Sequence, residues 1–138
     1  MTLIAIVDTG PLFAAADLSD ERHRACADAL QRPDLRLVVP ALVLAEATYL
    51  IGHRLGPTSE TAFLRALSEM DVEAPSPEDL LRMAELVEQY GDFPLGGTDA
   101  SIVALAERLG TPLVLTLDRR HFEAVRPRHC AAFELLPA

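Results

Sequence analysis

Short apolar runs alternate along this chain with longer segments in which apolar residues recur at helical spacing. The apolar runs predict strands at residues 3–7, 35–39, 72–74, 112–117 and 132–136. The amphipathic segments predict helices at residues 11–18, 20–32, 40–55, 58–70, 76–90 and 99–109, with one helical turn within 119–125. This alternation is typical of an α/β sandwich whose central sheet is mostly parallel, has about four to five strands and is flanked by helices.

Proline and short polar residues indicate where the helices begin. Asp20 is expected to cap the second helix, and Pro40 is expected to be the first residue of the third. Ser76 is followed by a proline and two acids, which is a strong helix start. Thr98 is expected to cap the helix that carries Asp99.

The length and composition favour one soluble domain. The chain has 138 residues, of which 50% are hydrophobic, so it is long enough for one core and too short for two ordinary domains. We therefore expect a single domain over residues 1–138. No apolar stretch approaches the roughly 20 residues of a membrane span, and the N-terminus reads as a strand rather than a charged leader. These features predict a cytoplasmic protein without a membrane segment.

The charge composition excludes some kinds of site. All 12 basic residues are arginines, because the sequence contains no lysine. This excludes a Walker-A phosphate loop and lysine Schiff-base chemistry. The formal net charge of −9 argues against a broad cationic surface, so any binding of nucleic acid requires a local basic patch.

Four acidic residues occupy positions where structural or apolar residues are expected. Asp8 and Asp118 each close an apolar run, and Asp99 opens a helix. The carboxyl ends of parallel strands share one rim with the starts of the following helices, so these three side chains are expected to meet. Glu46 lies inside a helix, about 9 Å along its axis at roughly 1.5 Å per residue. It joins the other three only if that helix crosses the rim.

Taken singly, three of these acids have ordinary explanations. Asp8 and Asp118 suit turns, and Asp99 suits the positive end of a helix. Glu46 differs, because its neighbours one helical turn away are apolar. They are Leu42, Val43, Tyr49 and Leu50. Such a face predicts a buried carboxylate, which requires a partner, so the four acids together indicate a shared cation.

The donor atoms indicate which cation. Carboxylate oxygens without clustered cysteine or histidine favour magnesium or manganese over zinc. The two cysteines lack metal-ligand spacing and are expected to be free thiols. The four histidines form no ligand pattern and are expected at the surface or in packing. They are His23, His53, His121 and His129.

Four short motifs surround the acids. They are Ile6-Val7-Asp8-Thr9-Gly10-Pro11-Leu12, residues 40–46 (PALVLAE), residues 97–106 (GTDASIVALA) and residues 115–122 (LTLDRRHF). In this order and at this spacing they resemble the PIN-domain ribonucleases, and more narrowly the VapC-type toxins of toxin–antitoxin pairs. The resemblance covers nearly the whole chain. One departure is Leu117, where many relatives carry a polar residue.

The resemblance implies a PIN-like three-layer sandwich and metal-dependent endonucleolytic hydrolysis of RNA that leaves a 5′-phosphate. A metal-activated water needs no 2′-hydroxyl nucleophile, so the lack of catalytic histidines is no objection. The implied magnesium or manganese ligands and catalytic residues are Asp8, Glu46, Asp99 and Asp118, with Thr9 and Thr116 as hydroxyl neighbours.

The resemblance also implies partners, namely a cognate antitoxin protein and a second copy of the chain in a homodimer. Candidate apolar surfaces for the antitoxin are the helix at 20–32 and the group Ala62, Phe63, Leu64 and Leu67, although core packing is the alternative for each. Arg119 and Arg120 directly follow Asp118 and are candidate contacts to RNA phosphates, with solvated surface arginines as the alternative.

Three other functions fit parts of the pattern. Asp8-Thr9-Gly10 matches the aspartic-protease triplet, but those enzymes are nearly all β and the triplet leaves the other three acids unexplained. A catalytically inactive PIN-like module that binds RNA or protein is the main alternative, and the presence of all four acids argues against it. A metal-dependent DNA nuclease is the third reading.

Overall fold

The computed structural model describes residues 2–138. Five strands form one sheet in the order β3-β2-β1-β4-β5, and every neighbouring pair is parallel. The strands are β1 (Leu3–Val7), β2 (Leu35–Pro40), β3 (Asp71–Glu73), β4 (Leu113–Leu115) and β5 (Glu134–Leu136). The predicted α/β architecture with a mostly parallel sheet is therefore confirmed, and the observed sheet is parallel throughout.

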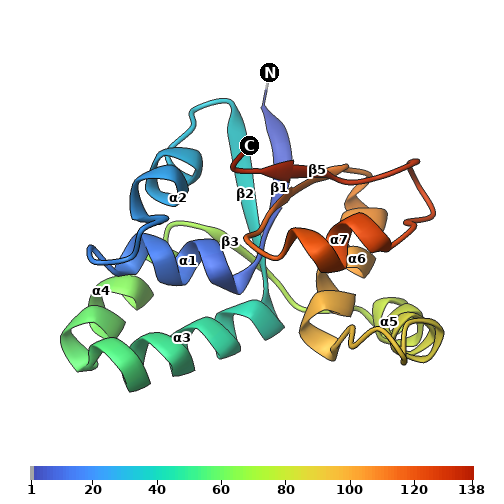
Figure 1. The fold of residues 1–138 in the computed structure, drawn as a ribbon, viewed down its shortest axis with the longest axis horizontal. Coiled ribbons are helices and arrows are strands. Elements are labelled where there is room, and N and C mark those ends of the chain that lie inside the picture. The colour runs from blue at the N-terminus through green and yellow to red at the C-terminus, as the bar shows by residue number, and fades with distance from the viewer. Residues whose placement is uncertain (1) are drawn as a thin grey trace.

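Within residues 2–138, seven helices connect and cover the strands (Figure 1). They are α1 (Thr9–Ala16), α2 (His23–Leu30), α3 (Ala41–Leu55), α4 (Pro57–Leu67), α5 (Pro77–Gln89), α6 (Gly97–Leu109) and α7 (Arg119–Ala124). Figure 1 shows α1 to α4 on one side of the strands, and α5 and α6 on the other. This produces the helix–sheet–helix layers of a three-layer sandwich.

The core lies around the central strand and one buried helix. β1 pairs with β2 on one side and β4 on the other, and its residues Ala5, Ile6 and Val7 have no exposed surface. This explains why β1 reads as a continuous apolar run rather than an alternating one. α6 packs against these strands and is buried along residues 100–106. Asp8, which follows β1, and Asp99, in the first turn of α6, are therefore attached to the buried core.

Three predicted helix starts are wrong in detail. Asp20 does not cap α2; its carboxylate accepts a hydrogen bond from the Arg22 backbone N–H in the preceding turn. Pro40 has extended dihedrals and ends β2, so α3 starts at the next residue. α6 starts at Gly97 with Gly96 at its N-cap, which places Thr98 inside the helix. The Ser76 start is confirmed, because Ser76 and Asp79 form a reciprocal capping box.

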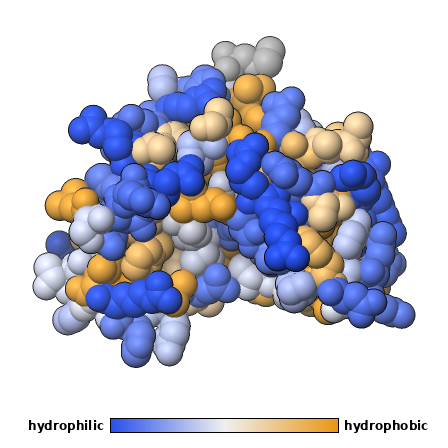
Figure 2. Space-filling view, in the orientation of Figure 1, coloured by the Kyte–Doolittle hydropathy of each residue, from blue (hydrophilic) through white to orange (hydrophobic). Residues whose placement is uncertain are grey.

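The surface is mostly hydrophilic. In the orientation of Figure 1, hydrophobic side chains appear in separate small groups (Figure 2). Over residues 2–138, no helix combines the length and the hydropathy that crossing a membrane requires.

Candidate active site

Four acidic side chains from separate parts of the chain line one cleft of about 510 Å³. Asp8 follows β1, Asp118 follows β4 by three residues, and Asp99 lies in the first turn of α6. These three share the carboxyl rim of the sheet, as the topological argument predicts. Glu46 reaches the same cleft from α3, so this helix does cross the rim.

The predicted burial of Glu46 is wrong. Its side chain is exposed, and its neighbour Tyr49 is 66% exposed. The buried face of α3 is formed instead by Val43, Ala47 and Ile51, which repeat every fourth residue. Glu46 lies beside that face and borders the cleft, so its position there does not depend on burial in an apolar environment.

A hydrogen-bond network holds Asp8 on the cleft floor. Its Oδ1 accepts from the Thr9 backbone N–H at 2.7 Å, and its Oδ2 accepts from the Thr116 hydroxyl at 2.7 Å. The Thr116 oxygen in turn accepts from the Asp118 backbone N–H at 2.9 Å. Asp8 and Thr116 are both buried, so their orientations are strongly restricted. Thr116 therefore links two of the four acids.

The electrostatics of the cleft raise the pKa of two carboxyl groups. Burial raises the pKa of Asp8 from 3.8 to about 6, even though its two hydrogen bonds act in the opposite direction. The carboxylates of Asp99 and Glu46 add to this rise. Burial also raises the pKa of Asp99, opposed by His121 and reinforced by Asp118. The ionised forms of Asp8 and Asp99 are therefore disfavoured in the folded protein.

His121 is a site residue that sequence reasoning missed. Asp118 caps α7 by accepting from the His121 backbone N–H at 3.3 Å, and the His121 Nδ1 contacts Asp118 Oδ2. The same nitrogen lies 3.9 Å from Asp99 Oδ2. The expectation that every histidine serves only surface or packing is wrong here. The available signal was the three-residue spacing from Asp118, which places both side chains on one helical turn.

The cleft contains further residues that the sequence did not single out. Arg54 reaches it from the last turn of α3, with its guanidinium carbon 5.5 Å from the centre of the Phe13 ring. The sequence signal for Arg54 was its spacing of eight residues from Glu46. This is slightly more than two helical turns, so both side chains lie on the same side of α3. The remaining additions are Gly10, Asp20, Leu50 and Leu117.

The two predicted RNA-binding arginines lie outside the cleft lining. Arg119 forms an exposed ion pair with Glu123 at 3.4 Å. Arg120 lies 5.2 Å from the centre of the Phe93 ring, and that ring meets His121 edge-on. Arg120 is thus connected to the acidic cluster through two aromatic contacts, whereas Arg119 is engaged with its own helix.

Comparison with known proteins assigns the family. The family model described as PIN domain matches residues 5–126. The chain belongs to the PIN-domain family. This PIN domain is 36% identical over 134 residues to Ribonuclease VapC26 of Mycobacterium tuberculosis (strain ATCC 25618 / H37Rv), a match that covers 96% of this chain and 99% of the relative. The resemblance seen in the sequence is confirmed.

Solved structures show the same fold. The crystal structure of VapC20 of Mycobacterium tuberculosis, a sarcin–ricin loop cleaving toxin, aligns with a TM-score of 0.71 and 21% identity, over 80% of this chain and 86% of that one. VapBC2 of Rickettsia felis, bound to a DNA fragment from its promoter, aligns with a TM-score of 0.70 and 17% identity, over 96% and 98% of the two chains. At these identities the structures establish the PIN fold alone.

The chemistry of the donor set in this PIN domain fits a hard divalent cation. The four carboxylates supply oxygen ligands, and burial destabilises the anionic form of two of them. The Thr9 hydroxyl oxygen is buried without a hydrogen-bond partner beside Asp8. Within residues 2–138, no three His, Cys, Asp or Glu side chains already converge as a ligand set.

Proposed function

We propose that this PIN-domain protein is a Mg²⁺- or Mn²⁺-dependent endoribonuclease, and that it is the toxin of a toxin–antitoxin pair. The observation that carries the proposal is that Asp8, Glu46, Asp99 and Asp118 all line one cleft at the carboxyl rim. The 36% identity to a ribonuclease over nearly the full length of both chains supports it. An inactive binding module has no need of an aspartate whose pKa is raised by burial and, to a smaller extent, by two neighbouring carboxylates.

The residues of the cleft have separate tasks in this proposal. When bound, a divalent cation supplies the positive charge that neutralises a phosphate and lowers the pKa of an attacking water. Asp8, Glu46, Asp99 and Asp118 provide the oxygen atoms that hold it. Thr116 orients Asp8 through its hydroxyl, and His121 orients Asp118. In this proposal four acidic ligands are therefore held by at least two positioning contacts, from Thr116 and His121.

Cleavage of RNA tests the proposed function directly. Purified protein is incubated with total cellular RNA in magnesium, in manganese and in chelator, and new 5′ ends are mapped. We expect discrete cuts that depend on the metal and disappear in Asp8→Asn, while Asp28→Asn, which removes an exposed acid outside the cleft, leaves them in place. Cuts that survive both chelation and Asp8→Asn would sink the proposed mechanism.

Parallel assays separate the two alternatives. A DNA nuclease cuts single-stranded or duplex DNA faster than RNA under the same metal conditions. An inactive module binds RNA or protein but makes no cuts with any metal. Measuring binding and cleavage on the same Asp8→Asn and wild-type samples distinguishes all three functions.

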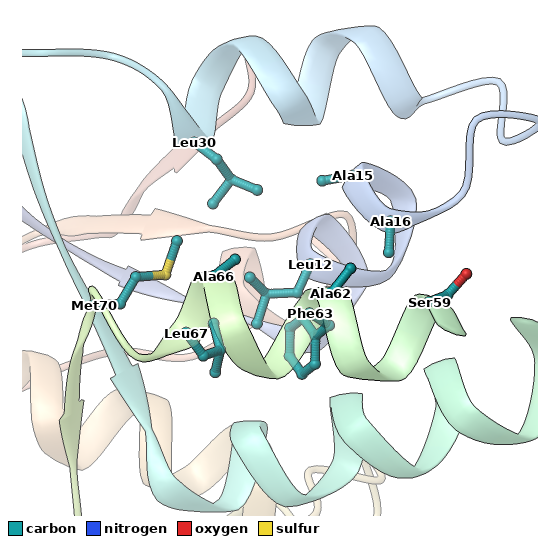
Figure 3. A pocket seen from close by; sticks show the side chains of 10 residues that line it. All are labelled: Leu12, Ala15, Ala16, Leu30, Ser59, Ala62, Phe63, Ala66, Leu67 and Met70. Atoms are coloured by element: carbon teal, nitrogen blue, oxygen red, sulfur yellow. The ribbon is translucent and has the colours of Figure 1, made fainter. Parts of the chain in front are cut away.

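We propose that the antitoxin binds an apolar pocket of about 340 Å³ between α1, α2 and α4. Leu12, Leu30, Phe63 and Leu67 are among the residues that line it, and Figure 3 shows Ala62 and Ala66 of α4 pointing toward the side on which Leu30 lies. Ala62 also lines the pocket, whereas Leu64 does not. Three of the four α4 residues proposed from the sequence, namely Ala62, Phe63 and Leu67, therefore line this pocket. The fourth, Leu64, is 46% exposed.

A charge placed at the pocket edge tests the antitoxin site. Ala66 lines the pocket and is exposed, so Ala66→Glu inserts a carboxylate into the apolar surface without disturbing the core. We expect it to abolish co-purification of the co-expressed antitoxin while RNA cleavage persists. Leu64→Glu is the matched control on the same helix and is expected to retain the partner. Equal retention by both variants would exclude this pocket.

The homodimer also remains a proposal, and α5 offers an apolar surface for it. Leu80, Leu81 and Val87 are exposed large apolar residues of this helix. We expect Leu81→Glu to shift the protein from dimer to monomer in sedimentation experiments, and an unchanged sedimentation coefficient would place the interface elsewhere.

A further inference from the structure

Arg54 is the one basic residue among those described that line the acidic cleft. It lies in the last turn of α3, two turns beyond Glu46 on the same helix. Leu50 lies between them and also lines the cleft. The three residues are spaced four apart, so they form one stripe of the helix that runs away from the acidic cluster.

The guanidinium of Arg54 has no acidic partner in the described chain. Five cleft residues carry carboxylates, yet none forms an ion pair with it, whereas six other arginines are paired with acids. Its contact is the face of the Phe13 ring, at 5.5 Å from the guanidinium carbon to the ring centre. Such a contact restrains the side chain while leaving its N–H donors available. Arg54 is therefore held in place with unused capacity to bind an anion.

The distance from the acids indicates which anion. The backbones of Glu46 and Arg54 are eight residues apart, or about 12 Å along the axis of α3 at roughly 1.5 Å per residue. This exceeds the spacing of neighbouring phosphates, about 3.4 Å along the axis of a stacked strand. A phosphate at Arg54 is consequently not the one being cleaved. It belongs to a nucleotide farther along the same strand.

The charge balance explains why such a contact is needed. The chain has a net charge of −9, and the cleft itself is lined by acidic residues. Long-range electrostatic attraction therefore contributes little to the binding of RNA. A single arginine that faces the cleft forms charge-assisted hydrogen bonds to phosphate where long-range attraction is missing. Tyr49 and His53 stack in parallel on the same helix with ring centres 5.7 Å apart, and Tyr49 is largely exposed, which adds an aromatic surface beside the stripe.

We propose that Arg54, restrained by Phe13, binds a backbone phosphate of single-stranded RNA away from the scissile bond, and that the strand runs along α3 from Glu46 to Arg54. This deepens the proposed ribonuclease function and rests on it. Arg54 acts as a substrate-binding residue. Its removal weakens binding of the strand and leaves the chemical step intact.

The test measures binding and turnover separately. Binding of a short fluorescein-labelled single-stranded RNA of mixed sequence is measured with magnesium in an Asp8→Asn background, which prevents cleavage. We expect Arg54→Gln to weaken binding about tenfold and to reduce the salt dependence by roughly one phosphate contact. Arg54→Lys is expected to recover part of the loss, because it keeps the charge without the planar fork. In otherwise wild-type protein, Arg54→Gln raises KM and leaves kcat nearly unchanged.

Arg65→Gln is the matched control. Arg65 is also exposed, also lies in the last turn of its helix, α4, and does not line the cleft. Both substitutions thus remove the same charge from the same kind of helix end. RNA affinity is expected to be unchanged in Arg65→Gln, and matched melting temperatures establish that both variants fold.

Three results overturn the inference. One is equal RNA affinity for Arg54→Gln and Arg65→Gln, and another is a fall in kcat at constant KM. The third is a loss of co-purifying antitoxin in Arg54→Gln without any change in RNA binding, which makes Arg54 a protein contact. Metal-dependent cleavage that is insensitive to Arg54 leaves the proposed function standing and the inference refuted. The remaining outcome is that RNA binding requires Arg54 but the wild-type protein cuts no RNA. This result supports the proposed strand path and refutes the ribonuclease function.

Discussion

The Thr116 hydroxyl donates a 2.7 Å hydrogen bond to Asp8 Oδ2 and accepts one of 2.9 Å from the Asp118 backbone N–H. A single side chain thereby joins the segments that follow two adjacent strands, β1 and β4. Thr116 is 1% exposed, so water does not replace these bonds. This hydroxyl group adds a side-chain link between Asp8 and the Asp118 segment to the backbone bond of 2.9 Å from the Asp8 N–H to the Leu115 carbonyl oxygen.

Removal of the Thr116 hydroxyl is expected to destabilise the cleft. Thr116→Val keeps the shape but leaves a buried carboxylate oxygen without its donor, at a cost of roughly 1–3 kcal/mol in the free energy of unfolding at neutral pH. Thr116→Ser retains the hydroxyl and is expected to lie closer to wild type. Chemical denaturation of the two variants measures the difference, and equal stability of the valine and serine proteins would contradict the assigned role.

Stability without metal is expected to fall as the pH rises through the titration of Asp8. The pKa of Asp8 is about 6 in the folded protein and 3.8 ordinarily, so between these values the folded state holds a proton that the unfolded state has released. The free energy of unfolding therefore decreases with pH in this window, by up to roughly 3 kcal/mol at 1.36 kcal/mol per pH unit. In Asp8→Asn, denaturation measured from pH 4 to 7 is expected to lose this component of the slope.

Metal binding is expected to offset the same penalty. Magnesium or manganese favours the ionised carboxylates, so the rise in melting temperature on metal addition should be larger at pH 7.5 than at pH 5. Asp8→Asn is expected to weaken this response, and Asp20→Asn, which alters a cleft aspartate outside the four-acid set, to retain it. An unchanged melting curve for wild type at pH 7.5 would count against a metal site.

His121 is expected to act by positioning Asp118. His121→Phe keeps an aromatic ring against Phe93 but removes the nitrogen that contacts the carboxylate. Loss of a partner of this kind typically lowers metal affinity or activity by roughly 10–100-fold. His121→Asn places an amide near the Nδ1 position and is expected to recover part of the loss. Titration of the melting temperature with manganese, alongside cleavage rates, checks this; identical metal affinities for the two variants would refute it.

The ion pair between Arg82 and Glu107 is expected to stabilise the fold without affecting the cleft. Two hydrogen bonds of 2.8 and 3.0 Å join the side chains between α5 and α6, and both residues are nearly buried. Arg82→Ala leaves Glu107 without its main partner and is expected to cost about 3 kcal/mol. The exposed pair of Arg36 and Asp71, at 2.7 Å, is the control, and Arg36→Ala is expected to cost less than about 1 kcal/mol. Urea denaturation distinguishes them, and equal costs would show that burial does not strengthen the inner pair.

Much of the fold follows from local features of the chain. Apolar runs and capping residues act over a few neighbours, so they predict that β1 spans residues 3–7 and that Ser76 starts α5. The sequence does not indicate where a helix begins when no side chain caps it. The start of α6 is such a case, because its N-cap residue, Gly96, has no side chain. Pro40 suited the end of a strand as well as the start of a helix, and only its extended dihedrals decide between them.

By itself, the sequence determined the order of the elements, the parallel sheet and the common rim of Asp8, Asp99 and Asp118, because these follow from local periodicity and strand direction. Only the tertiary structure decided that Glu46 reaches the cleft while exposed, that His121 contacts Asp118, and that Arg54 lies over Phe13. The last contact joins α1 to the far end of α3, so it depends on how two helices pack. The sequence shows that an amphipathic helix has a polar face. How the apolar face packs determines which residues of other elements the polar side chains contact.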